Sequence, residues 1–419
     1  MPDRRGLLST SRGLRRRRPS PTIPPVDPVT HSLTGAVLSK AGLNRTTPLA
    51  TATLVLAANA PDIDVVVALQ GGFASLAHRR GLTHGPLALL VLPILVAACV
   101  LLYDRLWRRR RADVAPALPV HVLGLAILGV LTHPLLDWMN TYGIRLLMPF
   151  SERWFYGDAL FIIDPWIWLV LAVPVVALAT SRRGRAGWII LGTGATLLVL
   201  MAPGVPLAAR TVWVVAIAAL VWRTAMAWRG RRPQMPDEDG VSSADAPATL
   251  SRIPGDATGL ARAAMAVTVL YIALMVGAGR LARVEVARSA AASGIDVLDV
   301  MVGPAPANPL AGDIVVEEPG AYRTGRFDWL AEPRVTWNPE PIPRLETDAV
   351  VLATLRLQEV RDYLRWSRYP YVDVSETAEG HVVRFRDARY PPRVRGGLAG
   401  PVVHVEGGRP AALPQQAPQ

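Results

Sequence analysis

Long apolar runs fill most of the first two thirds of this 419-residue chain. Six of them come close to the length of about 17–25 residues that a helix needs to cross the hydrocarbon of a bilayer. They cover residues 86–103, about 119–137, 159–180, 187–202, 210–228 and 261–281, and two weaker helical segments precede them at roughly 32–43 and 48–69. Because backbone amides must be satisfied internally in lipid, a chain with this pattern folds into a bundle of membrane helices.

The composition agrees with a membrane core that carries soluble parts. Hydrophobic residues make up 51% of the chain and charged residues only 19%, against about a quarter in soluble domains. The one cysteine, Cys99, lies inside an apolar run. An intrachain disulfide and a zinc site built on cysteines are therefore both excluded.

Arginine carries most of the net charge of +12 and gathers between the apolar runs. The clusters are Arg15–Arg18, Arg108–Arg111, Arg182–Arg185 and Arg229–Arg232. Such charge can bind nucleic acid, but clusters that flank membrane spans are better explained by the positive-inside rule, which places Lys and Arg in short cytoplasmic loops. We therefore expect the lipid bilayer as a partner and no nucleic acid.

The same rule predicts an orientation. Loops 104–118, 181–186 and 229–260 are basic and are assigned to the cytoplasm, whereas loops 138–158 and 203–209 are poorer in charge and face outward. The segment after residue 282 then lies on the extracytoplasmic side. The direction of the first two helices stays open, because the basic amino-terminal tail would favour the cytoplasm.

These features predict the fold class: an all-α polytopic membrane helical core with a small C-terminal soluble α+β domain. The domain contains runs of alternating polarity such as 381–386 and a helical run near 347–366, which are typical of short strands combined with one or two helices. The expected order is a disordered basic tail (1–30), the membrane core (31–230), a flexible cytoplasmic linker (231–260), a transmembrane helix (261–281), the extracytoplasmic domain (282–407) and a disordered tail (408–419).

Histidines and aspartates are concentrated in the membrane core, near the ends of its helices. His133 and Asp137 are four residues apart, so they share one helix face and can touch the same metal ion. A His–Asp hydrogen bond that closes the helix end is the simpler alternative. Asp62 and Asp64 follow Pro61, which interrupts an apolar helix, and they either bind metal or cap the helix at the bilayer edge.

Two further elements supply histidines. His78 and His84 flank Gly81, which permits a tight turn that would bring both imidazoles to one centre; the alternative is an ordinary basic loop at the membrane surface. His31 begins the first helix, and Gly35 one turn later leaves room beside its ring. Further candidates for ligands, or for residues that orient them, are Asn140, Asp158 and Asp164.

A charged side chain near hydrocarbon is costly and is kept there for chemistry or for a pathway. Imidazoles and carboxylates are ligands of hydrolytic zinc sites, and the sequence contains neither a G-x-S-x-G nucleophile motif nor a P-loop. Metal chemistry is therefore the simplest function for these residues. Two alternatives stay open: a transport protein with the same residues along an ion path, and a regulatory or scaffolding protein with a non-catalytic site.

The order of these motifs resembles the membrane-bound metal-dependent hydrolase family, also described as YdjM-like, LexA-binding inner-membrane-associated hydrolases. The resemblance covers about residues 30–180 and rests on H-S-L-T-G (31–35), A-P-D-I-D (60–64), H-R-R-G-L-T-H-G (78–85), H-P-L-L-D (133–137) and N-x-x-G (140–143). This chain departs from the family pattern by a second arginine before Gly81 and by Gly85 in place of the common serine. The family's similarity to zinc-dependent phospholipase C and to single-strand nucleases implies a bacterial inner-membrane enzyme that acts on a phosphodiester or phospholipid-like substrate.

Our hypothesis is therefore an integral inner-membrane hydrolase that uses one or two divalent metal ions, with zinc expected from the ligand types. The primary predicted ligands are His31, Asp62, His84, His133 and Asp137, with Asp64 and His78 next. A metal-activated water would attack the substrate. Asp64 would accept its proton, and Arg79 and Arg80 would stabilise the developing negative charge. The sequence leaves the oligomeric state open.

Overall fold

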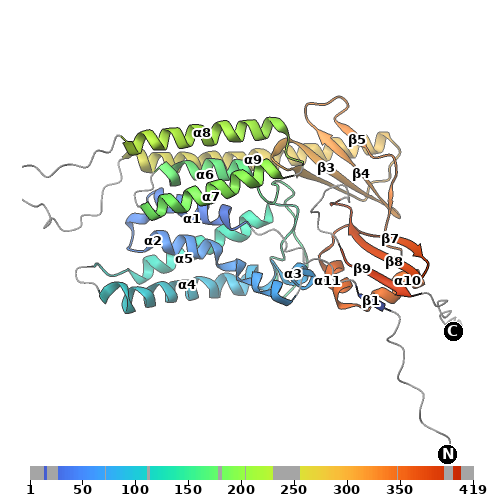
Figure 1. Cartoon of the computed structure of the whole chain (residues 1–419), viewed down its shortest axis with the longest axis horizontal. Coiled ribbons are helices and arrows are strands. Elements are labelled where there is room, and N and C mark those ends of the chain that lie inside the picture. Colours follow the sequence, from blue (N-terminus) through green and yellow to red (C-terminus); the bar gives the residue numbers. More distant parts are fainter. Residues whose placement is uncertain are drawn as a thin grey trace, which may run out of the picture.

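A computed structural model describes the backbone of residues 14–16, 27–70, 72–110, 114–177, 182–202, 204–229, 255–346, 348–390 and 400–406. A bundle of helices lies on one side of the molecule and a body of two antiparallel sheets on the other (Figure 1). This arrangement confirms the predicted fold class, a helical membrane core followed by a smaller α+β domain.

The bundle is built from eight α-helices among the described residues: α1 (Pro28–Lys40), α2 (Ala50–Asn59), α4 (Pro86–Leu106), α5 (Pro119–Trp138), α6 (Pro165–Ala177), α7 (Arg182–Met201), α8 (Leu207–Arg229) and α9 (Gly255–Ala292). A 3-10 segment, η2 (Ala60–Gln70), continues α2 beyond Pro61.

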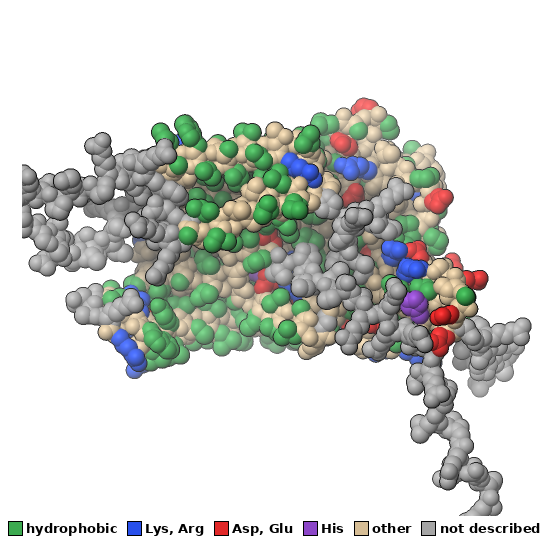
Figure 2. All heavy atoms as spheres, viewed as in Figure 1, with side chains coloured by type: hydrophobic (Ala, Val, Ile, Leu, Met, Phe, Trp, Pro, Cys, Tyr) green, Lys and Arg blue, Asp and Glu red, His purple; other side chains and the backbone are tan. Residues whose placement is uncertain are grey.

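In the described part of the chain, five stretches are long and apolar enough to cross a membrane: Ala50–Gln70, Pro86–Arg110, Pro119–Trp138, Leu207–Met226 and Thr258–Ala292. The protein is therefore a multi-pass membrane protein. Hydrophobic side chains cover much of the bundle surface in Figure 2, as lipid contact requires.

The helices differ in detail from the predicted spans. The run 159–180 becomes the shorter helix α6, because the preceding residues form a loop in which Asn140 pairs with Leu160 as an isolated bridge. Helix α9 is longer than the predicted 261–281 span and extends to Ala292 on the side of the sheets.

Close contact between backbones holds α2 between α1 and α5. A Cβ at Gly35 of α1 would lie 2.7 Å from the Leu54 carbonyl oxygen of α2, and a Cβ at Gly129 of α5 would lie 2.6 Å from the Ala57 Cβ. Leu54 and Ala57 are fully buried at these crossings. Small residues at helix crossings let membrane helices approach closely, and here they bring three site-bearing helices together.

The carboxy-terminal domain contains two antiparallel sheets. One has the order β2 (Asp299–Ala305), β3 (Asn308–Glu318), β4 (Ala321–Asp328), β5 (Val335–Trp337), with β6 (Ile342–Pro343) also paired to β4. The other has the order β1 (Leu14–Arg16), β9 (Val402–Glu406), β8 (Gly380–Asp387), β7 (Pro370–Thr377), accompanied by α10 (Ala349–Thr354) and α11 (Gln358–Trp366). The predicted alternation at 381–386 is part of β8, where Val383 and Phe385 are buried.

Strand β1 lies within the segment 1–30, for which the sequence predicts a disordered basic tail. Leu14 lies opposite Val405 in the pairing of β1 with β9. The amino-terminal segment therefore reaches the side of the bundle where the carboxy-terminal domain lies. Residues 1–13 and 17–26 of that tail, most of the linker prediction (231–254) and the predicted tail 408–419 lie outside the described residues.

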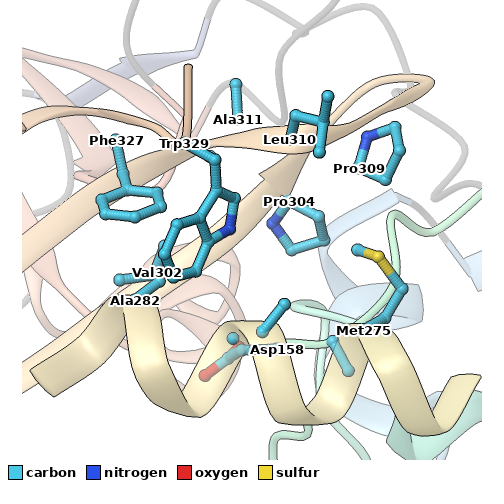
Figure 3. A pocket seen from close by; sticks show the side chains of 14 residues that line it. Asp158, Met275, Ala282, Val302, Pro304, Pro309, Leu310, Ala311, Phe327 and Trp329 are labelled. Carbon is cyan, nitrogen blue, oxygen red and sulfur yellow. The ribbon is translucent and has the colours of Figure 1, made fainter. Parts of the chain in front are cut away.

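The domain packs directly onto one end of the bundle. Tyr142, in the loop after α5, shares a buried cluster with Tyr363, Trp366 and Phe385 of the domain. The Arg389 guanidinium donates a hydrogen bond to the Thr141 carbonyl oxygen at 2.8 Å. The other sheet lies over α9, with Val302, Pro304 and Trp329 above Met275 and Ala282 (Figure 3).

Candidate metal centre

The five primary ligands predicted from the sequence meet at the end of the bundle that faces the domain. They come from four elements: His31 from α1, Asp62 from η2, His84 from the 3-10 turn η3 (Leu82–His84), and His133 and Asp137 from α5. His84 and His133 are fully buried. Two groups of three have potential donor atoms within 4.8 Å of one another: His31, His133 and Asp137, and Asp62, His84 and His133.

The centre of the site is the Asp137 carboxylate. Its Oδ2 lies 3.3 Å from His84 Nε2 and 3.5 Å from His133 Nε2. Two ligands at about 2.1 Å from a tetrahedral zinc ion are themselves about 3.4 Å apart. The spacing of these atoms therefore matches the edges of a zinc coordination tetrahedron.

These same three atoms are buried and have no hydrogen-bond partner among the described residues. Buried polar atoms are nearly always hydrogen-bonded, because an unsatisfied one costs about 1–3 kcal/mol. Three unsatisfied atoms that face one another, two imidazole nitrogens and one carboxylate oxygen, form a donor set of the kind that zinc binds. The residues present therefore fit a metal ion.

Hydrogen bonds at Nδ1 of His84 and His133 leave Nε2 of each ring available to bind a metal ion. His133 Nδ1 lies 2.7 Å from the Ala58 carbonyl oxygen, which can only accept, so Nδ1 carries the proton and Nε2 keeps its lone pair. Thr83 Oγ1 donates to Asp64 Oδ2 at 3.1 Å and lies 2.9 Å from His84 Nδ1. The hydroxyl therefore accepts from His84 Nδ1, and His84 Nε2 is free to bind a cation.

His31 and Asp62 extend the site to either side of His133. The rings of His31 and His133 stack with centroids 3.7 Å apart, and His31 Nε2 lies 3.5 Å from Asp137 Oδ1. Asp62 Oδ1 lies 3.8 Å from His133 Nε2. Two overlapping groups of donors are compatible with either one or two ions.

Two buried arginines neutralise most of the carboxylate charge. Arg79 pairs with Asp62 at 2.9 Å and with Asp64 at 3.3 Å. Arg80 pairs with Asp137 at 2.9 Å and donates to Asn140 Oδ1 at 2.8 Å. With neutral imidazoles, three carboxylates and two guanidiniums leave a net charge of −1, so a divalent cation would change it to +1.

Asp64 lies beside the centre but is occupied by other donors. Its carboxylate accepts hydrogen bonds from Arg79 Nε, the Arg80 amide and the Thr83 hydroxyl. Three donors from the chain therefore occupy this carboxylate. The contacts indicate that Asp64 positions the Arg79–His84 turn.

His78, a predicted ligand, does not reach the centre. It is the last residue of α3 (Gly72–His78) and its side chain is exposed. Arg80 then adopts a positive φ of 53°, and the chain turns so that His84 points inward. The prediction that this turn brings both histidines together is wrong for that reason. The space provided by Gly35 also accommodates the α2 backbone, not the His31 ring.

The supporting residues are partly those predicted. Asn140 does bind Arg80, but Asp164 accepts from the Trp166 amide at the start of α6, and Asp158 pairs with Arg283 and Arg368. Sequence reasoning missed Arg145, which is buried and donates to the Ala77 carbonyl oxygen at the end of α3. A lone arginine in a mixed-charge loop carries no local signal of this contact.

Fold and site together define a class of protein: a polytopic membrane protein with a buried His–Asp–Arg centre at one end of its helical core. Residues 26–226 match the model of a family described as YdjM inner membrane protein, which confirms the resemblance. The chain is also 29% identical over 110 residues to a Bacillus subtilis (strain 168) protein described as uncharacterized protein YfhP. That alignment covers 26% of this chain and 31% of the relative. No solved structure matches the chain.

Proposed function

We propose that this protein is a metal-dependent hydrolase of the bacterial inner membrane, which acts on a phosphodiester or phospholipid-like substrate. One observation carries the proposal: Nε2 of His84, Nε2 of His133 and Oδ2 of Asp137 face one another, buried and without hydrogen-bond partners in the described structure. A purely structural His–Asp cluster would satisfy these atoms internally. Their arrangement supports a site built for a cation.

In this proposal His84, His133 and Asp137 hold the ion, and His31 and Asp62 complete its surroundings or hold a second one. A zinc ion bound there would lower the pKa of a coordinated water to about 7 and would polarise a phosphoryl group. Asp62 replaces Asp64 as the proposed base, since its carboxylate lies at the edge of the donor set and, of the two buried arginines, pairs with Arg79.

The electrostatics favour an anionic substrate. The centre changes from a net charge of −1 to +1 when a dication binds, and Arg79 and Arg80 stay next to it. A single negative charge, as on a phosphodiester, would restore neutrality in the buried site. A cavity of about 20 Å³ lined by His31, Asp137 and Asn140 is large enough for a water molecule.

We also propose that this end of the bundle faces the outside of the cytoplasmic membrane. Helix α4 begins near α3 at the domain side and runs away from it, so Arg105 and Arg108 lie at the opposite end of the bundle. The positive-inside rule assigns that opposite end to the cytoplasm. The pairing of β1 with β9 supports an outer location for the amino-terminal segment as well, against the preference of its arginines for the cytoplasm.

The test uses the full chain purified in detergent. We expect a stoichiometric divalent metal, zinc by preference, and hydrolysis of phosphodiesters or phospholipids that a chelator abolishes. His133→Ala should lose both the metal and the activity, whereas His78→Ala, an exposed histidine of the same region, should keep both.

Other outcomes would contradict the proposal. Absence of metal in the wild type, or activity that ignores the chelator, would exclude the mechanism. Bound metal without hydrolysis of any phosphoester would favour the regulatory or scaffolding alternative. The contacts favour a hydrolase over a transport role, because the His–Asp–Arg cluster lies at one end of the bundle in the part of the chain that the structure describes.

A further inference from the structure

A second polar pocket lies beside the carboxyl end of α5, against the outer part of α9. It has a volume of about 160 Å³, the space of about five liquid water molecules. Its walls include Trp138, Tyr156, Asp158, Gly279, Arg280 and Arg283. None of the five primary predicted ligands lines it, so it is separate from the candidate metal centre.

The length of α9 places this pocket at the bilayer surface. The candidate span Thr258–Ala292 has 35 residues, which is about 52 Å of helix against about 30 Å of hydrocarbon. Counted from Thr258, the hydrocarbon ends after about 20 residues, near Gly279. Arg280 and Arg283 follow at once, with Trp138 and Tyr156 across the pocket, as is typical of the aromatic and basic residues at a membrane interface.

The pocket contains unsatisfied hydrogen-bonding atoms. Arg283 donates through its terminal nitrogen to Asp158 Oδ2 at 2.9 Å, but its Nε is buried with no partner among the residues described. Asp158 Oδ1 is also buried and unpartnered within the described chain. Arg280 is exposed and forms no ion pair in the part of the chain that the structure describes.

Positive charge exceeds negative charge around this pocket. Asp158 is shared by Arg283 and Arg368, each at 2.9 Å, and Arg368 also pairs with Asp299 at 3.2 Å. Together with Arg280 this makes three arginines and two aspartates. One further anion at the pocket would balance the group, and the free Nε–H of Arg283 is a donor for it.

We propose that this pocket binds the phosphate group of a membrane phospholipid, held by Arg280 and Arg283. The acyl chains would stay in the bilayer beside the apolar part of α9, and Trp138 and Tyr156 would border the headgroup. The unpartnered Asp158 Oδ1 would accept a hydrogen bond from a hydroxyl or ammonium group of that headgroup. The proposal does not depend on the proposed hydrolase function.

The experiment measures phospholipid retained by the full chain after extraction, using native mass spectrometry and nanodiscs that contain phosphatidylglycerol and phosphatidylethanolamine. We expect Arg280→Gln and Arg283→Gln to lower the apparent affinity about tenfold, which corresponds to about 1.4 kcal/mol. Arg288→Gln is the matched control, because Arg288 lies further along α9 with its side chain 75% exposed. Arg280→Gln breaks no ion pair of the described structure, so it keeps the test valid even if Arg283→Gln fails to fold.

The outcomes separate the possibilities. Equal retention in all variants, or an equal loss in Arg288→Gln, would overturn the site. Competition by inorganic phosphate or glycerol phosphate at millimolar concentration would support phosphate binding from a soluble source, and its absence would support the lipid headgroup. His133→Ala should leave lipid retention unchanged, so failure of the metal site and failure of this pocket are distinguishable.

Discussion

Thr83 and the Ala58 carbonyl group fix the two imidazoles whose Nε2 atoms face Asp137. Neither would touch a bound ion, yet each determines which ring nitrogen is available. Asp64 acts indirectly, because it accepts hydrogen bonds from the Thr83 hydroxyl and the Arg80 amide and so orients both groups. At the scale of residues, the site is a set of ligands and a second set of groups that select their tautomers.

Thr83→Ala should therefore weaken metal binding without removing a ligand. Loss of a group that orients a ligand typically costs about 10–100-fold in metal affinity, and His84 would lose the acceptor for its Nδ1 proton. Thr83→Ser keeps the hydroxyl and should bind metal almost normally. Titration of the metal-free protein with zinc measures both variants, and equal affinities for Ala and Ser would contradict this role.

Helices α1, α2 and α5 position the ligands through the glycine contacts described above. A methyl group at Gly35 would collide with the Leu54 carbonyl oxygen, which belongs to rigid helix backbone. His31 is one helical turn before Gly35, so any separation of α1 from α2 would also move His31 relative to His133. Packing and ligand geometry are thus coupled at this crossing.

Gly35→Ala should destabilise the bundle by about 1–3 kcal/mol, the usual cost of overpacking, and should lower metal content. Gly124→Ala is the matched control, since a Cβ at this position of α5 meets nothing within 4 Å. Thermal unfolding in detergent, followed by metal analysis, compares the two variants. If Gly35→Ala has the same melting temperature and metal content as Gly124→Ala, the site does not depend on the close contact between α1 and α2.

Within the domain, the Asp387 side chain at the end of β8 contacts both the start of the 367–369 segment and Arg389. Arg389 in turn contacts the bundle. Asp387 accepts from Ser367 Oγ and the Arg368 amide and pairs with Arg389 at 2.9 Å. Burial by itself raises the pKa of Asp387, but the Arg389 charge and the hydrogen bonds outweigh it and hold that pKa below its usual range. A lowered folded-state pKa stabilises the fold above the unfolded value of about 3.9.

The contribution of Asp387 should therefore be complete at neutral pH and be lost as the pH falls through its lowered folded-state pKa. At pH 7, Asp387→Asn should lower the free energy of unfolding by about 3 kcal/mol, because a buried arginine is left without its partner. This difference between variant and wild type should become smaller as the pH falls. Thermal unfolding at several pH values measures this. Asp373→Asn, whose partly exposed side chain pairs with Arg386, should show little change; a pH-independent difference for Asp387→Asn would contradict the assignment.

At the scale of the whole molecule, the carboxy-terminal domain covers the end of the bundle that contains the candidate metal centre. The loop after α5 contributes Asn140 to the centre, while its neighbours Thr141 and Tyr142 contact the domain. The amino-terminal strand β1 joins the same domain, so both ends of the described chain lie on one side of the bundle.

Labelling of intact cells tests the orientation that we propose. In a Cys99→Ala background, Glu340→Cys in the domain should react with a membrane-impermeant maleimide, and Arg109→Cys, in the turn after α4, should react only after the membrane is opened. Both positions are exposed, so accessibility within the protein does not limit labelling. The reverse pattern would place the domain and the metal centre in the cytoplasm.

The sequence by itself determined the membrane helices, the α+β domain and the residues that meet at the candidate metal centre. Apolar length, the alternation in β8 and the i, i+4 spacing of His133 and Asp137 are local properties that a chain expresses wherever it folds. Only the tertiary structure decided that His84 lies at the centre while His78 does not. It also decided that three hydrogen-bond donors occupy the Asp64 carboxylate and that β1 pairs with β9. These outcomes depend on backbone turns and on contacts between residues far apart in the chain. A local sequence pattern does not report the energies of such contacts.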